Sequence, residues 1–217
     1  MLWVIEISKI FEKKTENTNK IEKIYKNVRI ILRLHAKQDK IYCIQENNRG
    51  YIMEKIYETA YAKINLGLDV LGKRSDGYHE VRMVMQSVGL SDAVEIEEGE
   101  GLVVETDHSG LAGGPDNLAW KAAELLARCC GKIPNVHIRL NKKIFLAAGL
   151  AGGSSDAAAV MRGLSRLWQL DLTAPELEKL AAELGSDIPF CITGGTALAE
   201  GRGEILTAVS YTHLRAH

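Results

Sequence analysis

A stretch rich in glycine and alanine, residues 145–158, has the composition of a loop that binds an anion. Gly149, Gly152 and Gly153 have no Cβ atom, so they can take positive φ and let backbone N–H groups approach a ligand. Mostly apolar residues then recur at nearly helical spacing: Val160, Met161, Leu164, Leu167, Trp168 and Leu170. The helix that this spacing predicts would add unpaired amides and the positive end of its dipole, which would stabilise a phosphate.

Ser154 or Ser155 could cap this helix at its N-terminus. The glycines are not spaced as in the dinucleotide-binding motif G-x-G-x-x-G, and the P-loop motif G-x-x-x-x-G-K-[ST] does not occur in the chain. The segment therefore predicts a phosphate loop of another type. A flexible connection between a strand and a helix is the alternative that the glycines alone leave open.

Lys63 and Asp187 are charged residues whose surroundings suggest catalysis. Lys63 lies in the otherwise apolar, strand-like run Y-A-K-I-N-L, and Asp187 lies between Gly185 and another apolar run. Beside a bound triphosphate, a carboxylate can accept the proton of an attacking hydroxyl, and an ammonium group can hold that carboxylate ionised. The pair thus predicts phosphoryl transfer. An edge lysine and an Asx-turn aspartate are the structural alternatives.

Tyr78 and His79 follow the turn-forming residues 75–77. An aromatic ring and an imidazole on one turn can stack against a planar base and form hydrogen bonds to its polar edge. This predicts a site for a nucleobase, and a structural turn with a packed tyrosine is the alternative.

The composition is that of an ordinary globular protein: 217 residues, 46% apolar and 25% charged, enough for one or two domains. The net charge of −1 argues against a nucleic-acid-binding surface. No apolar run approaches membrane-spanning length, and Glu6 and Lys9 interrupt the region where a signal peptide would need its apolar core. We therefore expect a soluble, cytoplasmic protein with a small-molecule substrate. The sequence does not indicate an oligomeric state.

The cysteines form no metal or disulfide pattern. Cys43, Cys129, Cys130 and Cys191 contain no C-x-x-C pair and no histidine at metal-ligand spacing. We interpret them as buried or incidental thiols in a reducing compartment, and we predict no metal site built by the protein alone.

The two ends of the chain differ from the middle. Residues 1–52 carry 11 Lys and Arg against 6 Asp and Glu, a net charge of +5, whereas the remainder carries 16 against 22, a net charge of −6. This first segment has only a weak helical rhythm over residues 21–34, which predicts a poorly folded basic extension. Residues 48–50 can be encoded by a purine-rich run resembling a bacterial ribosome-binding site, so Met53 is the expected start. Residues 208–217 are expected to be a foreign tail.

Between these ends, the pattern predicts strands over residues 56–71, 81–89, 93–97, 102–106, 136–140, 190–192 and 196–200. It predicts helices from residue 115 to Cys130, after the glycine-rich segment, and after Thr173. Gly131 and Gly185 would end the first and the last of these, and Thr173 and Glu176 would form a capping box. Strands and helices without strict alternation indicate an α+β domain.

Four segments, residues 61–80, 145–158, 184–190 and 199–206, occur in the order seen in the GHMP small-molecule kinase superfamily, which the chain closely resembles. The run A-K-I-N-L followed by D-G-Y-H narrows the resemblance to members that act on a cytidine diphosphate-linked methylerythritol. The resemblance implies a ribosomal protein S5 domain 2-like fold over residues 53–207, with a mixed sheet packed against helices. It also implies ATP-dependent phosphorylation of the substrate's 2-hydroxyl, with Mg²⁺, in the non-mevalonate route to isoprenoid precursors.

The resemblance further implies residue roles. Asp187 would be the catalytic base and Lys63 its electrostatic partner, Asn65 would line the substrate site, and Tyr78 and His79 would hold the cytosine. Asn117 would lie near the adenosine. The remaining ATP contacts would come from one loop: Phe145, Leu146, Ala147, Ala148, Gly149, Leu150, Ala151, Gly152, Gly153, Ser154 and Ser155.

The chain departs from the family pattern at two points. Phe145 stands where the family usually has proline, so a fixed φ is lost at the entry of the loop. The resemblance also stops near Thr207, and the second domain that closes the active site in this superfamily does not follow. We therefore expect a weakly active or inactive fragment. The alternatives are another kinase of this superfamily, acting on homoserine, mevalonate or a sugar, and a non-catalytic nucleotide-binding fragment.

Overall fold

A computed structural model describes residues 30–34, 41–46 and 52–209, and the chain divides into two units, residues 1–56 and 57–217. In the first unit, β1 (Ile30–Leu34) pairs antiparallel with β2 (Ile41–Glu46), which pairs antiparallel with the start of β3 (Ile52–Lys73). The helical rhythm expected for residues 21–34 is therefore wrong for residues 30–34, which form β1. The expectation that Met53 is the start of the protein stays a prediction.

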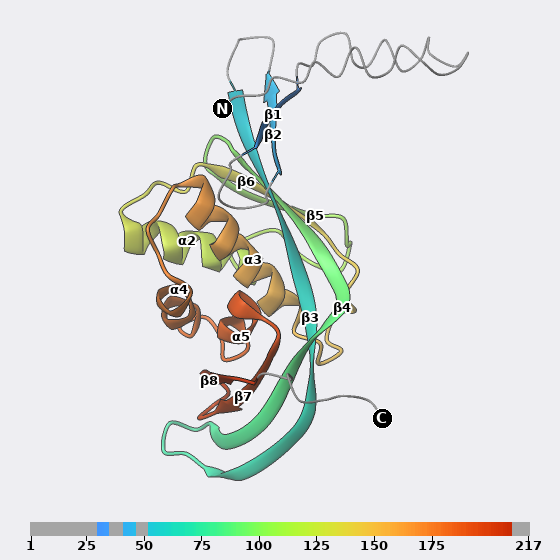
Figure 1. The fold of residues 1–217 in the computed structure, drawn as a ribbon, viewed down its shortest axis with the longest axis vertical. Coiled ribbons are helices and arrows are strands. Elements are labelled where there is room, and N and C mark those ends of the chain that lie inside the picture. Colours follow the sequence, from blue (N-terminus) through green and yellow to red (C-terminus); the bar gives the residue numbers. More distant parts are fainter. Residues whose placement is uncertain (1–29, 35–40, 47–51, 210–217) are drawn as a thin grey trace, which may run out of the picture. The chain divides into compact units, whose positions relative to one another are not determined.

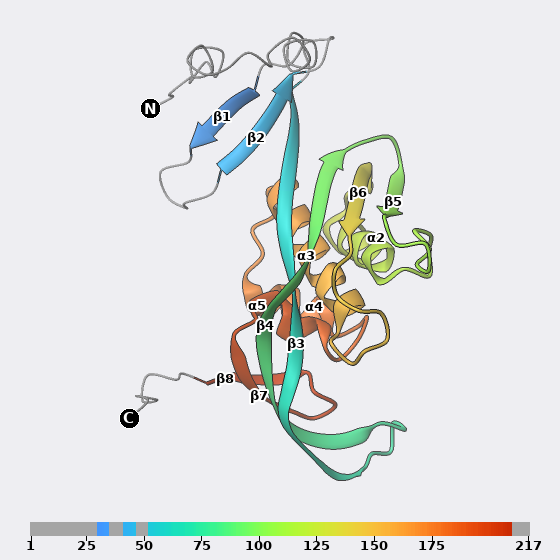
Figure 2. The same ribbon diagram turned by 90° about the vertical axis from the view of Figure 1, so that its right-hand side faces the viewer.

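In the second unit, β3 lies at one side of a sheet in the order β3, β4, β6, β5. β4 (His79–Glu98) pairs antiparallel with β6 (Val136–Asn141), and β6 pairs parallel with β5 (Leu102–Thr106). β7 (Thr196–Glu200) pairs antiparallel with the first part of β4 and with β8 (Ile205–Ala208). Parallel and antiparallel neighbours in one sheet confirm the mixed sheet expected of the domain (Figure 2).

The predicted strands over residues 81–89 and 93–97 are one long strand, β4. Its first part pairs with β7 and its second part with β6, so the two predicted strands correspond to segments with different partners. The turn predicted around residues 75–77 is present and joins β3 to β4. The backbone N–H of Tyr78 donates to Oδ1 of Asp76 there, as an Asx-type turn requires.

The helices lie on one face of this sheet (Figure 1): α2 (Leu118–Cys130), α3 (Gly152–Leu167), α4 (Ala174–Ala181) and α5 (Ile188–Thr193). α2 begins after Asn117, whose side chain accepts from the N–H of Ala119, and ends at Gly131 in the left-handed conformation, as predicted. The predicted capping box of α4 is confirmed, since Glu176 accepts from the N–H of Thr173. None of the described helices is long and apolar enough to cross a membrane.

The core lies between the sheet and α3. Residues 155–161 of α3 are all buried, and four of them are alanine or aspartate with short side chains that let neighbouring elements approach closely. α3 packs against α2 on one side and α5 on the other. α3, which begins within the glycine-rich segment, therefore contacts both of these helices.

The prediction of a strand over residues 190–192 is wrong, because these residues lie in α5. A run of three apolar residues is too short to show a period, so the apolar composition alone suggested a strand. Pro189, in the first turn of α5, is the signal for a helix start in this position.

Candidate active site

Lys63 is a buried lysine on β3, with 4% of its surface exposed. Its Nζ atom donates a hydrogen bond to Oδ1 of Asn65, 3.0 Å away, and lies 3.5 Å from Oδ1 of Asp187. A buried ammonium group requires such partners to stay charged. The structure therefore brings together the two residues predicted for catalysis and one residue predicted for the substrate site.

Asp187 occupies the N-cap position of the short helix α5, and its side chain is about one-third exposed, at 36%. Its carboxylate can therefore contact both Lys63 and a ligand. The other end of α5 is held by Arg162 of α3, whose Nη1 atom donates to the carbonyl of Cys191 at 2.6 Å and of Ile192 at 3.3 Å. Arg162 also pairs with Glu58 of β3 at 3.1 Å. These contacts fix α5, and with it Asp187, against the strand that carries Lys63.

The glycine-rich segment forms a loop in which three alternate residues have positive φ: Ala147 (55°), Gly149 (72°) and Ala151 (58°). Gly152 and Gly153, which we expected in this conformation, instead form the first turn of α3. Alternation of left-handed residues with ordinary ones turns successive N–H groups toward one side, which makes an anion-binding concavity. Alanine is uncommon at positive φ, and its presence there twice indicates a backbone held in place by its surroundings.

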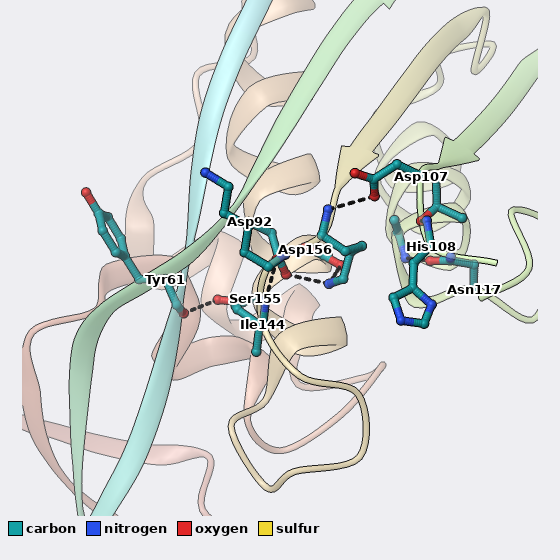
Figure 3. A network of polar contacts seen from close by, with 12 residues as sticks. Tyr61, Asp92, Asp107, His108, Asn117, Ile144, Ser155 and Asp156 are labelled. Atoms are coloured by element: carbon teal, nitrogen blue, oxygen red, sulfur yellow. Dashed lines mark hydrogen bonds and ion pairs between the residues drawn. The ribbon is translucent and has the colours of Figure 1, made fainter. Parts of the chain in front are cut away.

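Ser154 and Ser155 do not cap α3, contrary to the prediction, because the helix begins before them and Ala151 is its N-cap residue. The hydroxyl of Ser155 instead donates to the carbonyl of Tyr61 on β3 (Figure 3). Two residues further along this strand, the N–H of Lys63 donates to the carbonyl of Leu150 at 3.1 Å. The loop is thus hydrogen-bonded to β3 on both sides of its junction with α3, next to Lys63.

The loop offers unpaired donors to a ligand. The N–H groups of Gly152, Gly153 and Ser154 belong to the first turn of α3, where no acceptor exists within a helix. Residues 145–149 are exposed, and Phe145 is 72% exposed. An open concavity of N–H groups at a helix N-terminus can bind an anion such as a phosphate.

Tyr78 and His79 lie at the β3–β4 turn and are both exposed. The guanidinium carbon of Arg202 lies 4.9 Å from the centre of the Tyr78 ring, in a cation–π contact. The turn that holds Arg202 reaches toward Asp187, because a Cβ atom placed on Gly203 would lie 3.9 Å from Cβ of Ser186. These contacts therefore connect the predicted nucleobase site with the Asp187 segment through Arg202 and Gly203.

Asn117 is 7% exposed, and its side chain caps α2 at the Ala119 N–H and donates to the carbonyl of Ala112 at 2.8 Å. The start of α2 lies beside the start of α3, because Cδ1 of Leu118 lies 3.5 Å from a Cβ atom placed on Gly153. The role of Asn117 near the adenosine stays a prediction, and its structural role is that of a cap.

A buried charge cluster, formed by Asp92, Lys142 and Asp156, was not predicted from the sequence. Nζ of Lys142 lies 2.5 Å from Oδ2 of Asp92 and also forms an ion pair with Asp156, and all three side chains are at most 2% exposed. Burial raises the pKa of Asp156 to about 7. The sequence holds no spacing pattern for this cluster, because its three members lie far apart along the chain.

Cys191 lies in α5, close to the site, and burial raises the pKa of its thiol to about 11. The thiol is therefore protonated near pH 7, which makes it a poor nucleophile. Among the described residues, no three His, Cys, Asp or Glu side chains are grouped so that they could hold a metal ion.

The known proteins that are similar in sequence and those that are similar in fold include the same kind of kinase. Residues 117–195 match the GHMP kinases N terminal domain family. The chain is 55% identical over 148 residues to the 4-diphosphocytidyl-2-C-methyl-D-erythritol kinase of Synechococcus sp. (strain JA-3-3Ab), covering 68% of this chain and 48% of that protein. It is 52% identical over 158 residues to the enzyme of the same name from Bacillus pumilus (strain SAFR-032), covering 72% and 55%.

A crystal structure of a 4-(cytidine 5'-diphospho)-2C-methyl-D-erythritol kinase superimposes with a TM-score of 0.62 at 38% identity, over 71% of this chain and 55% of that one. The chain thus spans about half the length of the relatives it matches.

Proposed function

The chain carries the N-terminal domain of a GHMP kinase, and from this premise we propose that it takes part in ATP-dependent phosphorylation of the 2-hydroxyl of 4-diphosphocytidyl-2-C-methyl-D-erythritol. The observation that carries the proposal is the contact between Lys63 and Asp187 beside a loop built from N–H donors. GHMP kinases use ATP as co-substrate, and this chain's own loop would hold its phosphates.

In the proposed reaction, the substrate hydroxyl oxygen attacks the γ-phosphorus of ATP. The bond between that phosphorus and the β–γ bridging oxygen breaks, and ADP leaves. Asp187 accepts the hydroxyl proton, since its carboxylate is partly exposed and lies beside Lys63. The ammonium group of Lys63 favours the ionised carboxylate, and the N–H groups of Gly152 and Gly153 stabilise charge on the phosphates.

Mg²⁺ is part of the proposal because the triphosphate carries several negative charges in a small volume. Mg²⁺ is usually held by one or two carboxylates together with phosphate oxygens and water, so it does not require a cluster of protein ligands. Asp187 is one partly exposed carboxylate near this loop, since Lys63 contacts both Asp187 and Leu150. When bound, the ion would neutralise charge on the transferred phosphate.

The substrate side of the proposal rests on Asn65, Tyr78 and His79. Asn65 is bonded to Lys63, so a substrate group that contacts its amide would be brought next to the reacting atoms. Tyr78 presents an aromatic ring and His79 an imidazole at one exposed turn, which suits a cytosine. We also propose that the reaction takes place in the cytoplasm, since both ATP and this substrate are charged, diffusible metabolites.

Two alternatives remain beside the main proposal. Another GHMP kinase activity, on homoserine, mevalonate or a sugar, would need no nucleobase-binding site at Tyr78 and His79. A non-catalytic nucleotide-binding fragment would bind ATP without transfer, since the matched segment spans only about half of the relatives' length and their remaining half could be needed to exclude water.

Thermal unfolding of the purified chain with and without ligands separates these possibilities. We expect Mg·ATP to raise the melting temperature, and 4-diphosphocytidyl-2-C-methyl-D-erythritol to raise it further, because each ligand that binds only the folded state stabilises it. Homoserine and mevalonate should have no effect. Protection by either of these, with none by the cytidine-bearing compound, would overturn the proposed substrate, and ADP release in a coupled assay would separate a kinase from a nucleotide-binding fragment.

A further inference from the structure

We propose that Asp92 is a positioning residue for the nucleotide: through Lys142, Lys143 and Ile144 it holds the entry of the glycine-rich loop against the start of α3. This inference rests on the proposed function, because it concerns the geometry of the loop that would bind the ATP phosphates. Neither the resemblance nor the sequence pattern assigns a role to this aspartate.

Asp92 lies on β4, and its two carboxylate oxygens accept hydrogen bonds from different donors. Oδ1 accepts from the backbone N–H groups of Lys143 and Ile144, the latter at 2.8 Å. Oδ2 accepts from Nζ of Lys142 at 2.5 Å. One buried side chain thus fixes three consecutive residues that end directly before Phe145. A carboxylate that accepts backbone N–H bonds makes strong, oriented contacts.

Lys142 extends this attachment to the other end of the loop. Its Nζ atom also pairs with Asp156 in α3, and it would lie 3.6 Å from a Cβ atom placed on Gly152. Figure 3 shows Asp92 and Asp156 close together near the start of α3. The backbone N–H of Lys142 donates in addition to Asp107 at 2.9 Å. The buried charge cluster therefore joins the two ends of the loop, residues 142–144 and 152–156.

The position of this attachment explains how the loop can keep its shape with Phe145 at its entry. Proline would restrict φ by its ring, whereas phenylalanine leaves φ free, and the side chain of Phe145 is 72% exposed. Restraint must then come from the residues before it. Asp92 supplies that restraint at Lys143 and Ile144, and Ile144 is itself only 2% exposed.

The test compares Asp92→Ala and Asp92→Asn with Glu105→Gln, a matched control that removes an exposed carboxylate paired with Arg139. Hydrogen exchange is followed by mass spectrometry in the ligand-free protein for a peptide covering residues 152–162 at the start of α3, where the amides from Ser155 onward are hydrogen-bonded, and for one from α2. The affinity for Mg·ATP is measured by calorimetry.

We expect exchange in residues 152–162 to be about tenfold faster in Asp92→Ala, and the dissociation constant of this variant for Mg·ATP to rise about tenfold. Asp92→Asn should lie between this variant and the wild type, because its amide oxygen can still accept from the two N–H groups. The α2 peptide and Glu105→Gln should match the wild type. Asp92→Asn decides the question by the same criteria if Asp92→Ala does not fold.

Wild-type exchange and affinity in both Asp92 variants would overturn the inference, as would a uniform increase over all peptides, which indicates a merely structural role. A wild-type protein that does not bind Mg·ATP would contradict the proposed function whatever the variants do. A wild-type protein that binds Mg·ATP, with variants that behave as it does, would contradict the positioning role alone.

Discussion

The backbone N–H of Lys63 donates to the carbonyl of Leu150 in the glycine-rich loop, 3.1 Å away. The side chain of the same lysine lies 3.5 Å from Asp187. One residue of β3 therefore contacts the loop with its backbone and the carboxylate with its ammonium group. The separation between the proposed phosphate site and the proposed base is fixed by a strand rather than by a flexible connection, which favours precise orientation of reacting groups.

Replacing Lys63 by methionine should separate these two tasks. The Lys63→Met side chain keeps most of the apolar length and the backbone bond to Leu150, but the charge beside Asp187 is lost. We expect the rate of ADP formation in a coupled assay to fall by a factor on the order of 10² or more, with the affinity for Mg·ATP nearly unchanged. Lys121→Met, on an exposed position of α2, is the control. An unchanged rate in Lys63→Met would exclude an electrostatic role for the lysine.

The two glycines at the start of α3 should respond differently to alanine. A Cβ atom at Gly152 would lie 3.0 Å from Cγ2 of the buried Ile144, whereas at Gly153 its nearest neighbour would be Cδ1 of Leu118 at 3.5 Å. We expect Gly152→Ala to lower the free energy of unfolding by about 1 kcal/mol or more, because the neighbouring side chain is tightly packed. Gly153→Ala should leave it unchanged or raise it by less than about 1 kcal/mol. Urea denaturation measures both, and equal effects would contradict the close packing at Gly152.

The buried charge cluster predicts a pH-dependent difference between the wild type and Asp156→Asn. The pKa of Asp156 is about 7 in the folded protein and 3.8 as a reference value. A pKa raised by folding means that the folded state binds more protons between these values. The contribution of Asp156 to stability is therefore fully present below about pH 4 and is lost as the pH rises to about 7.

Asparagine cannot ionise, so Asp156→Asn should gain stability relative to the wild type as the pH rises from 5 to 8. Each pH unit within this window contributes at most about 1.4 kcal/mol. Urea denaturation at four pH values gives the difference in the free energy of unfolding between Asp156→Asn and the wild type. The contributions of the other titrating groups cancel, because both proteins contain them. A difference that does not change with pH would show that Asp156 is ionised throughout.

Local signals in the sequence predicted the limits of α2. Pro115 and Asp116 before an apolar periodic run and Gly131 after it gave these limits to within a few residues, because signals for a helix start and end act on neighbouring backbone groups. The same local signals failed at Ser154 and Ser155. There the helix begins earlier, directly after Ala151, whose backbone is in a left-handed conformation. Both serines therefore lie inside the helix and cannot cap it.

The sequence predicted individual residues of the candidate site, but it did not predict the buried residues that hold the loop beside them. Lys63 and Asp187 stood out because each is charged within an apolar surrounding, and the structure brings them into contact. Asp92, Lys142 and Asp156 come from β4, the end of β6 and α3, and their contact follows only from the tertiary arrangement. A buried ion cluster between distant residues has no spacing pattern that the sequence alone could reveal.

Single-turnover transfer of labelled γ-phosphate, with the protein in excess over ATP, tests the central claim most directly, since it detects even weak activity. The wild type should transfer the label to 4-diphosphocytidyl-2-C-methyl-D-erythritol and not to homoserine or mevalonate. Asp187→Asn should bind ATP normally and transfer more slowly by a factor on the order of 10²–10⁴, while Asp171→Asn, an exposed aspartate, should match the wild type. Equal transfer by Asp187→Asn, or no acceptor-dependent transfer by the wild type, would contradict the assignment of this site as a kinase centre.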